Sequence, residues 1–227
     1  MGILIAIEGT DSSGKQTQSE LVYNKLTELG IPARQVSFPA YESESSALVK
    51  MYLSGKFGSE PGDVNAYAAS TFYAVDRFAT YRTDWKKDYD AGKVIVADRY
   101  VPSNLIHQAA KLENKAEKEC FIEWLEELEY KHFGLPVPDA TIFLNMPPQS
   151  AAMLMADRAN KIDSSDKKDI HERNLEYLKK SYDNAVGVAR SRGWHEVSCA
   201  GCGTDVRSIE DIHTDIMKIV ACTLKTV

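Results

Sequence analysis

The sequence predicts an α/β fold in three layers, in which a parallel five-stranded sheet is flanked by helices. Short apolar runs rich in β-branched residues alternate along the chain with longer runs of helical periodicity. Strands that are separated by helices form parallel sheets with both faces covered. The chain has 227 residues, 44% of them hydrophobic, which is enough for the core of one domain. We therefore expect residues 1–227 to form a single domain.

The strands are predicted by short apolar runs that lie between helical patterns. In chain order these strands are 3–8, 34–38, 94–98, 141–144 and 194–197. Helical periodicity fills the intervals between them. The predicted helices are 15–29, 46–54, 63–91, 103–111, 115–133, 149–157, 169–192 and 208–224. Gly30 is typical of a left-handed cap at the end of the first helix, and Pro32 follows where a helix cannot continue.

Residues 158–168 interrupt this pattern. The segment is polar, has almost nothing to bury and lies between two helical patterns. Segments of this kind form surface loops that move more than the elements they join. We predict a small mobile lid here.

The overall charge limits the classes of partner. A net charge of −6 and a pI near 5.5 argue against a sequence-independent grip on nucleic acid, which requires a basic surface. The apolar run at the N-terminus is too short for a signal sequence or a membrane span. We therefore expect a cytoplasmic protein without a nucleic-acid or membrane partner. Cys199 and Cys202 lack two further ligands at zinc-site spacing, so free thiols are expected.

The strongest local signal is the run GTDSSGK at residues 9–15, which follows an apolar strand and precedes a helix. This is the context of a P-loop, whose glycines let backbone N–H groups surround a phosphate while the lysine reaches the transferred group. It predicts the P-loop NTPase fold and ATP as a ligand. The expected ATP-binding residues are Gly9, Thr10, Asp11, Ser12, Ser13, Gly14, Lys15, Gln16 and Thr17.

Gln16 departs from the motif. A serine or threonine normally follows the lysine and ligates Mg²⁺, whereas the amide oxygen of Gln16 is a poorer ligand. Thr17 comes one position late. A carboxylate such as Asp11 is therefore expected to contribute to the metal site.

A second cluster, Asp98 and Arg99, follows the predicted strand 94–98. Open α/β sheets bind ligands at the carboxyl ends of their strands. Asp98 suits Mg²⁺ or its waters, and Arg99 can form two parallel hydrogen bonds to a phosphate. The alternative is that the two residues merely pair with each other at a helix start.

Tyr73 and Arg77 are four residues apart and share one face of a predicted helix. A ring beside a guanidinium suits a nucleobase, which the ring stacks on and the guanidinium hydrogen-bonds. Taken alone, such a pair is more often core packing plus a surface charge. Both interpretations stay open at this point.

These segments, in this order, resemble the thymidylate kinases over nearly the whole chain. The similar segments are 8–17, 38–41, 53–55, 73–77, 98–104 and 135–139. A residue without a hydroxyl after the P-loop lysine also occurs in a bacterial branch of that family.

The resemblance implies roles for individual residues. Tyr73, with Phe72 as a neighbouring candidate, would stack on thymine; Ser103, Asn104 or Gln108 would read the pyrimidine edge. The implied dTMP-binding set is Asp11, Pro39, Tyr41, Leu53, Phe72, Tyr73, Arg77, Arg99, Ser103, Asn104, His107, Gln108 and His171. Arg77 would donate to thymine O4, and Arg99 would hold the acceptor phosphate. The implied metal ligands are Asp11, Asp98 and Glu172.

Many members of the family carry an arginine in the P-loop or shortly after the second strand, where this chain has Gln16 and Ala40. The charge of the transition state must then be met elsewhere. A cation delivered by a closing lid also excludes water, so Arg158, with Lys161, Lys167 and Lys168, is the expected source. The expected catalytic set is Lys15, Arg99, Arg158 and Asp11.

The resulting functional prediction is a thymidylate kinase that moves the γ-phosphate of ATP to dTMP with the help of Mg²⁺. The family resemblance also implies a homodimer, for which helices 63–91 and 115–133 offer a surface. Two alternatives stay open: a kinase for another nucleotide or a deoxynucleoside, and a nucleotide-responsive binding protein with little turnover.

Overall fold

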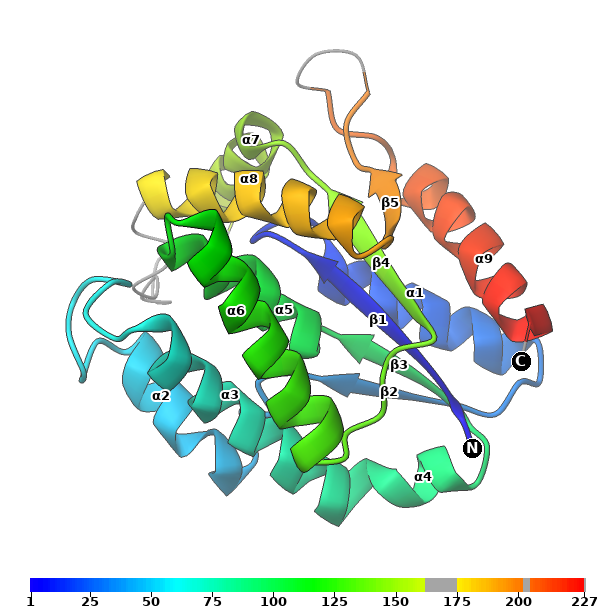
Figure 1. Ribbon diagram of the computed structural model, residues 1–227. Coiled ribbons are helices and arrows are strands. Elements are labelled where there is room, and N and C mark those ends of the chain that lie inside the picture. Colours follow the sequence, from blue (N-terminus) through cyan, green and yellow to red (C-terminus); the bar gives the residue numbers. More distant parts are fainter. Residues whose placement is uncertain (162–174, 202–204, 227) are drawn as a thin grey trace.

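Parallel strands form the predicted sheet, with the strand order β2-β3-β1-β4-β5 (Figure 1). The strands are β1 (Ile3–Gly9), β2 (Ala33–Ser37), β3 (Val94–Asp98), β4 (Ala140–Asn145) and β5 (His195–Ser198). The computed structural model describes residues 1–161, 175–201 and 205–226, with side chains for all of these except 155–161, 175–176 and 226. The three-layer α/β fold and its five-stranded sheet are confirmed.

The central position of β1 determines where the site lies. In the register, Ile7 of β1 pairs with Asp98 at the end of β3, and Gly9 pairs with Leu144 near the end of β4. The segments that follow β1 and β3 therefore leave the sheet side by side at its carboxyl edge. This is the edge at which open parallel sheets bind ligands.

Each face of the sheet is covered by its own set of helices (Figure 1). Alternate residues of β1 enter the two cores, with Leu4 and Ala6 on one face and Ile5 and Ile7 on the other. The second face packs against α1 (Lys15–Glu28), α7 (Pro148–Lys161) and α9 (Ile209–Thr226). The first packs against α5 (Val101–His107) and α6 (Lys115–Glu126), and α8 (Leu175–Ser191) packs beside α5. Burial on both faces explains why the strands are apolar without alternation.

The prediction of one continuous α-helix over residues 63–91 is wrong. It consists of α3 (Ala66–Thr80), a π-helical turn (Tyr81–Trp85) and α4 (Lys86–Asp90). Tyr81 and Trp85 are both buried, with ring centroids 4.6 Å apart. Before it, α2 (Ala47–Leu53) follows a 3-10 turn (Glu44–Ser46).

Two further predicted helices end in a different helical form. The helix predicted at 115–133 is α6 followed by a π-helical turn (Glu127–His132), and that at 103–111 is α5 followed by a 3-10 turn (Ala109–Lys111). The first π turn of the chain carries core aromatics, and this second one carries the buried Glu129. Single π turns of this kind are frequent at functional sites.

The predicted lid, residues 158–168, lies mostly outside the described residues. Its first four residues continue the backbone of α7, which the sequence predicted to end at residue 157. The single-domain prediction and the lid stay predictions. No helix in the described part of the chain combines the length and apolar composition that a bilayer span requires. The cytoplasmic location also stays a prediction.

Candidate active site

The P-loop surrounds its own lysine. Lys15 begins α1, and its Nζ donates hydrogen bonds to the Thr10 carbonyl at 2.6 Å and the Ser13 hydroxyl at 3.4 Å. Burial, and secondarily the charge of Arg99, lowers the pKa of Lys15 to about 8, although nearby carboxylates act against this shift. Gly9 is required here because a Cβ at its position would meet Ser13 Oγ at 2.5 Å. The loop thus holds a buried cation at the end of the central strand.

Gln16 lines the cavity in front of this loop, and its side chain is engaged along α1. Its side-chain amide donates to Glu20 on the next turn of α1, at 3.2 Å. Asp98 offers a better metal ligand, because one of its oxygens, Oδ1, is buried and finds no hydrogen-bond partner among the described residues. Asp98 lines the same cavity as Lys15 and Thr17. A buried, unpartnered carboxylate oxygen beside a phosphate loop fits Mg²⁺ or one of its waters.

The structure gives two of the three predicted metal ligands a position. Asp11 and Asp98 both border the cavity in front of the P-loop, whereas Glu172 lies outside the described residues. No group of three or more metal-ligating side chains is found in the ranges that the structure describes. The full ligand set therefore stays a prediction.

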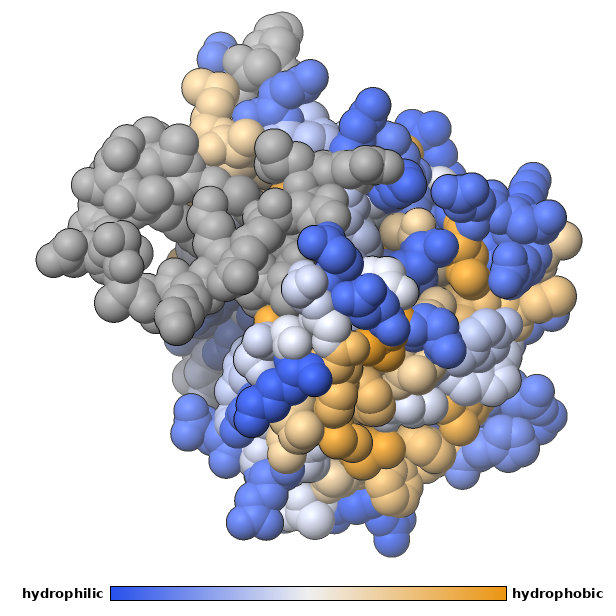
Figure 2. All heavy atoms as spheres, turned by 90° about the vertical axis from the view of Figure 1, so that its left-hand side faces the viewer, coloured by the Kyte–Doolittle hydropathy of each residue, from blue (hydrophilic) through white to orange (hydrophobic). Residues whose placement is uncertain are grey.

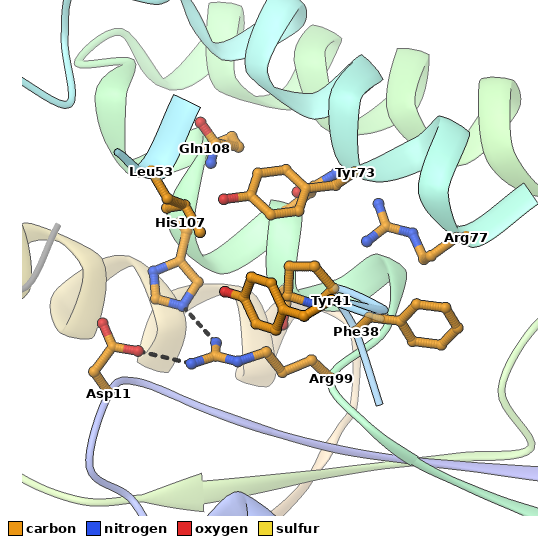
Figure 3. Close-up of a pocket in the computed structure, with 12 residues that line it drawn as sticks. Asp11, Phe38, Tyr41, Leu53, Tyr73, Arg77, Arg99, His107 and Gln108 are labelled. Atoms are coloured by element: carbon orange, nitrogen blue, oxygen red, sulfur yellow. Dashed lines mark hydrogen bonds and ion pairs between the residues drawn. The ribbon is translucent and has the colours of Figure 1, made fainter. Parts of the chain in front are cut away.

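Arg99 joins the end of β3 to the P-loop. Its Nη2 donates to Asp11 Oδ1 at 2.7 Å, and its Nη1 lies 3.3 Å from His107 Nε2 (Figure 3). The alternative in which Arg99 merely pairs with its neighbour Asp98 is wrong, since its ion pair is with Asp11. A guanidinium only donates, so this contact is a hydrogen bond in the tautomer that leaves His107 Nε2 unprotonated.

Arg99 adopts an unusual backbone conformation, with φ at +67°. This left-handed region is uncommon for residues other than glycine. The conformation turns the chain between β3 and α5 and brings the guanidinium toward the pocket shown in Figure 3. Burial would raise the pKa of Asp11, but Arg99, His107 and Lys15 hold it well below its usual range. Asp11 is therefore ionised and stabilises the cation.

A pocket opens beside Arg99 (Figure 3). It is lined by Asp11, Phe38, Pro39, Tyr41, Leu53, Tyr73, Arg77, Arg99, Ser103, Asn104, His107 and Gln108. All except Phe38 belong to the predicted dTMP-binding set. Five of these residues, Asp11, Phe38, Pro39, Tyr41 and Arg99, also line the cavity of the P-loop. The two hollows therefore meet at Arg99.

Arg77 is not a surface charge. It is 1% exposed and forms a two-pronged ion pair with Glu129, with 2.6 Å from Nε to Oε2 and from Nη2 to Oε1. Its remaining nitrogen, Nη1, donates to the Tyr100 carbonyl at 3.4 Å. Figure 3 shows its guanidinium directed toward the pocket beside Tyr73. The interpretation of Arg77 as core packing plus a surface charge is therefore wrong.

The three candidates for the pyrimidine edge have different partners. Ser103 donates to Glu8 at 2.6 Å, and Asn104 donates to the Ser70 carbonyl at 3.4 Å. The Oε1 atom of Gln108 is buried and accepts no hydrogen bond from the described residues. Phe72 packs against Phe57, with ring centroids 5.5 Å apart, and is not among the described residues that line the pocket.

Several residues that shape the site were missed by sequence reasoning. Asp76 accepts from the Ala40 N–H at 2.8 Å and the Ser45 hydroxyl at 2.6 Å, and so holds the pocket segment that follows β2. Glu8 and Glu129 are fully buried acids. Glu8 could have been noticed as the one acid in an apolar strand, whereas Glu129 lies in an acidic helical run that looks like a solvated face. His171 and the side chain of Arg158 lie outside the described part of the structure.

Comparison with known proteins now identifies the family. A family model described as thymidylate kinase matches residues 7–216. The chain belongs to the thymidylate kinase family. A thymidylate kinase of Mycobacterium tuberculosis is 32% identical over 196 residues, which cover 85% of this chain and 87% of that protein. A thymidylate kinase of Schizosaccharomyces pombe is 27% identical over 223 residues, covering 97% and 92%.

A solved structure supports the thymidylate kinase fold. The thymidylate kinase of Candida albicans superposes with a TM-score of 0.71 and 22% identity, covering 97% of this chain and 92% of that one. The resemblance that the ordered motifs indicated is confirmed. The motifs of this family member that meet at the carboxyl edge of the sheet are the P-loop, Asp98-Arg99 and the Tyr73–Arg77 face of α3.

Proposed function

We propose that this thymidylate kinase transfers the γ-phosphoryl group of ATP to the 5′-phosphate of dTMP, giving dTDP and ADP. The observation that carries the proposal is the junction of the two hollows at Arg99. One hollow contains a phosphate loop with a buried lysine, and the other contains aromatic rings with hydrogen-bonding groups. A donor triphosphate and an acceptor monophosphate bound in them would face each other, as in-line transfer requires.

The acceptor phosphate would be held by Arg99. On entering, it competes with Asp11 for the guanidinium, to which Asp11 is now 2.7 Å away. Asp11 would then be left to orient the sugar hydroxyl or a metal-bound water. Arg99 directly follows β3, and Lys15 ends the loop that follows β1, so the two cations that face the reacting phosphates are carried by the segments that leave two neighbouring strands.

Thymine would stack on Tyr73 and meet Gln108. The unpartnered Oε1 of Gln108 supports a ligand with an N–H donor, which thymine offers at N3 and cytosine does not. Arg77 Nη1 has two N–H groups, so it would donate to thymine O4 with the one that the Tyr100 carbonyl does not accept. Ser103 is favoured less as a base contact, because its hydroxyl is engaged by Glu8.

Adenine would occupy a third hollow beside the P-loop. Its lining residues come from the P-loop with α1, from α7 and from the segment that leads into α9, and they include Gly14, Thr17, Met146, Val206 and Ile209. Apolar walls next to the phosphate loop suit a purine ring.

Mg²⁺, when bound, would neutralise charge on the transferred phosphates. Asp98 and Asp11 would hold it or its waters. The basic residues of the described chain that line the phosphate cavity are Lys15 and Arg99. Further charge is proposed to come from Arg158, as the sequence predicted.

The proposal extends to a homodimer. Figure 2 shows apolar residues gathered on the face that carries α2 and α3. The exposed hydrophobic side chains on these two helices are Leu48, Tyr67, Val75 and Phe78. An exposed apolar face of this kind is typical of an interaction surface.

Direct detection of dTDP tests the proposal. Incubation with Mg·ATP and dTMP should yield dTDP and ADP in equal amounts on ion-exchange chromatography. Lys15→Ala should abolish the product, while Lys25→Ala, which removes an exposed lysine from the same helix, should leave it unchanged. Absence of dTDP, or turnover that survives in Lys15→Ala, would contradict the proposal.

A further inference from the structure

Glu8 is the one acid in an otherwise apolar strand, and it is completely buried. It directly precedes the P-loop glycine, Gly9. Burying a carboxylate is unfavourable unless hydrogen bonds or charges compensate it. Its neighbours therefore indicate what the residue does.

Both oxygens of Glu8 bind the segment that follows β3. Oε1 accepts the backbone N–H of Tyr100 at 2.7 Å, and Oε2 accepts the hydroxyl of Ser103 at 2.6 Å. Tyr100 precedes α5, and its own side chain makes no capping hydrogen bond. A side chain from the central strand thus fixes the start of a helix that belongs to another part of the chain.

The residue between the two fixed peptides is Arg99. Its own N–H donates to the Ile7 carbonyl at 3.1 Å, and the next N–H, that of Tyr100, donates to Glu8. β1 therefore holds the backbone on both sides of Arg99, which has the unfavourable φ of +67°. Strained conformations persist only where the surroundings impose them. In this backbone conformation the guanidinium of Arg99 faces Asp11 and the pocket.

We propose that Glu8 is a positioning residue, whose carboxylate holds the Arg99–Tyr100 turn so that Arg99 faces the acceptor phosphate. This inference rests on the proposed function. Glu8 touches neither substrate in this account and acts through Arg99. Because Glu8 adjoins the P-loop, the same strand sets the positions of the donor lysine and the acceptor arginine.

The ionisation of Glu8 provides a specific readout. Burial raises the pKa of Glu8 to about 7, against the lowering effects of the Ser103 hydrogen bond, Arg99, the Tyr100 N–H and Lys15. The titratable and charged groups around it are Arg99 after β3, Lys15 of the P-loop and Tyr130 of the π-helical turn. Above pH 7 the carboxylate makes charge-assisted hydrogen bonds, which are the stronger kind. Below pH 7 its protonated form accepts from Tyr100 and donates to Ser103.

Glu8→Gln reproduces this protonated form at every pH, because its amide oxygen accepts and its amide nitrogen donates. We expect the parent kcat/KM for dTMP to exceed that of Glu8→Gln about tenfold at pH 8 and to approach it at pH 6. The ratio of parent to variant kcat/KM at each pH is the quantity compared, because the titration of dTMP affects both enzymes equally and cancels. The KM for ATP should rise less than the KM for dTMP, since Lys15 and the loop remain and Glu8 is only one of the three carboxylates that raise the pKa of Lys15. Glu196 is an exposed glutamate of β5, so Glu196→Gln is the matched control. Its ratio of parent to variant kcat/KM should stay near one at both pH values.

A ratio that does not change with pH, or an equal rise in the KM for ATP, would overturn the proposal. A second measurement does not depend on turnover: in a crystal structure of Glu8→Ala, Arg99 should leave the left-handed region and lose its ion pair with Asp11. Arg99 unchanged in that structure would also overturn it. Failure of the parent to form dTDP would instead contradict the proposed function. If Glu8→Ala does not fold, the pH dependence of Glu8→Gln decides.

Discussion

Glu129→Gln perturbs the buried ion pair beneath the pocket. Arg77 and Glu129 have side chains that are 2% and 0% exposed, so a neutral partner leaves the guanidinium charge uncompensated away from water. Removing one partner of such a pair costs about 3–5 kcal/mol. Glutamine still accepts one hydrogen bond, so we expect about 3 kcal/mol, or a fall in Tm of about 6–12 °C for a chain of this size.

The same change should weaken dTMP binding. The hydrogen bonds from Nε and Nη2 to Glu129 fix the orientation of the Arg77 guanidinium, and with it the position of Nη1. Weakening these hydrogen bonds should therefore raise the KM for dTMP about tenfold. Thermal unfolding and steady-state kinetics with dTMP as the varied substrate measure the two effects. Glu127→Gln, on the same π turn but exposed and paired with Lys131, should alter neither.

A double variant separates stability from binding. Arg77→Met combined with Glu129→Leu replaces the ion pair with apolar side chains, which is often neutral for stability. We expect the Tm to return close to that of the parent while the KM for dTMP stays raised. Recovery of both would refute a role for Arg77 in the pocket, and an unchanged Tm in Glu129→Gln would refute the role of the ion pair.

Further predictions concern the metal, the donor, the base and the dimer. Asp98→Asn should raise the Mg²⁺ concentration for half-maximal activity about tenfold in a titration at fixed ATP, because it removes a charged ligand. With a pKa of about 8, Lys15 is charged below that pH and neutral above it, so the KM for Mg·ATP should rise above pH 8 in initial-rate assays. Gln108→Leu should lower kcat/KM for dTMP about tenfold relative to dCMP in a comparison of the two acceptors, because it removes the acceptor for N3–H. Val75→Glu should convert dimer to monomer in light scattering, whereas Val137→Glu, which is also exposed, should not.

Local features of the site could be predicted from the sequence. The P-loop is contiguous, and its glycines, lysine and flanking elements are visible within a few residues. Asp98 and Arg99 end a short apolar strand, so their place at the carboxyl edge follows from the βαβ pattern. Tyr73 and Arg77 were correctly expected on one helical face. These predictions required only spacing and residue type.

The features that sequence reasoning missed depend on contacts between distant segments. Arg77 and Glu129 are 52 positions apart, and only the fold shows that they are buried together. The π turn that carries Glu129 has no periodicity that distinguishes it from the α-helix before it. The left-handed backbone of Arg99 is imposed by β1 and not by the residue type. Tertiary packing overrides local preference at these positions.

Thymidylate as the acceptor is the central claim, and a coupled ADP-release assay tests it most directly. The purified chain would be given Mg·ATP with dTMP, dUMP, dCMP, UMP, thymidine or no acceptor. The account predicts that ADP release depends on the acceptor and that kcat/KM is highest for dTMP. Release that does not depend on an acceptor, or a preference for thymidine over dTMP, would contradict the role given to Arg99, and a preference for dCMP over dTMP would contradict the role given to Gln108.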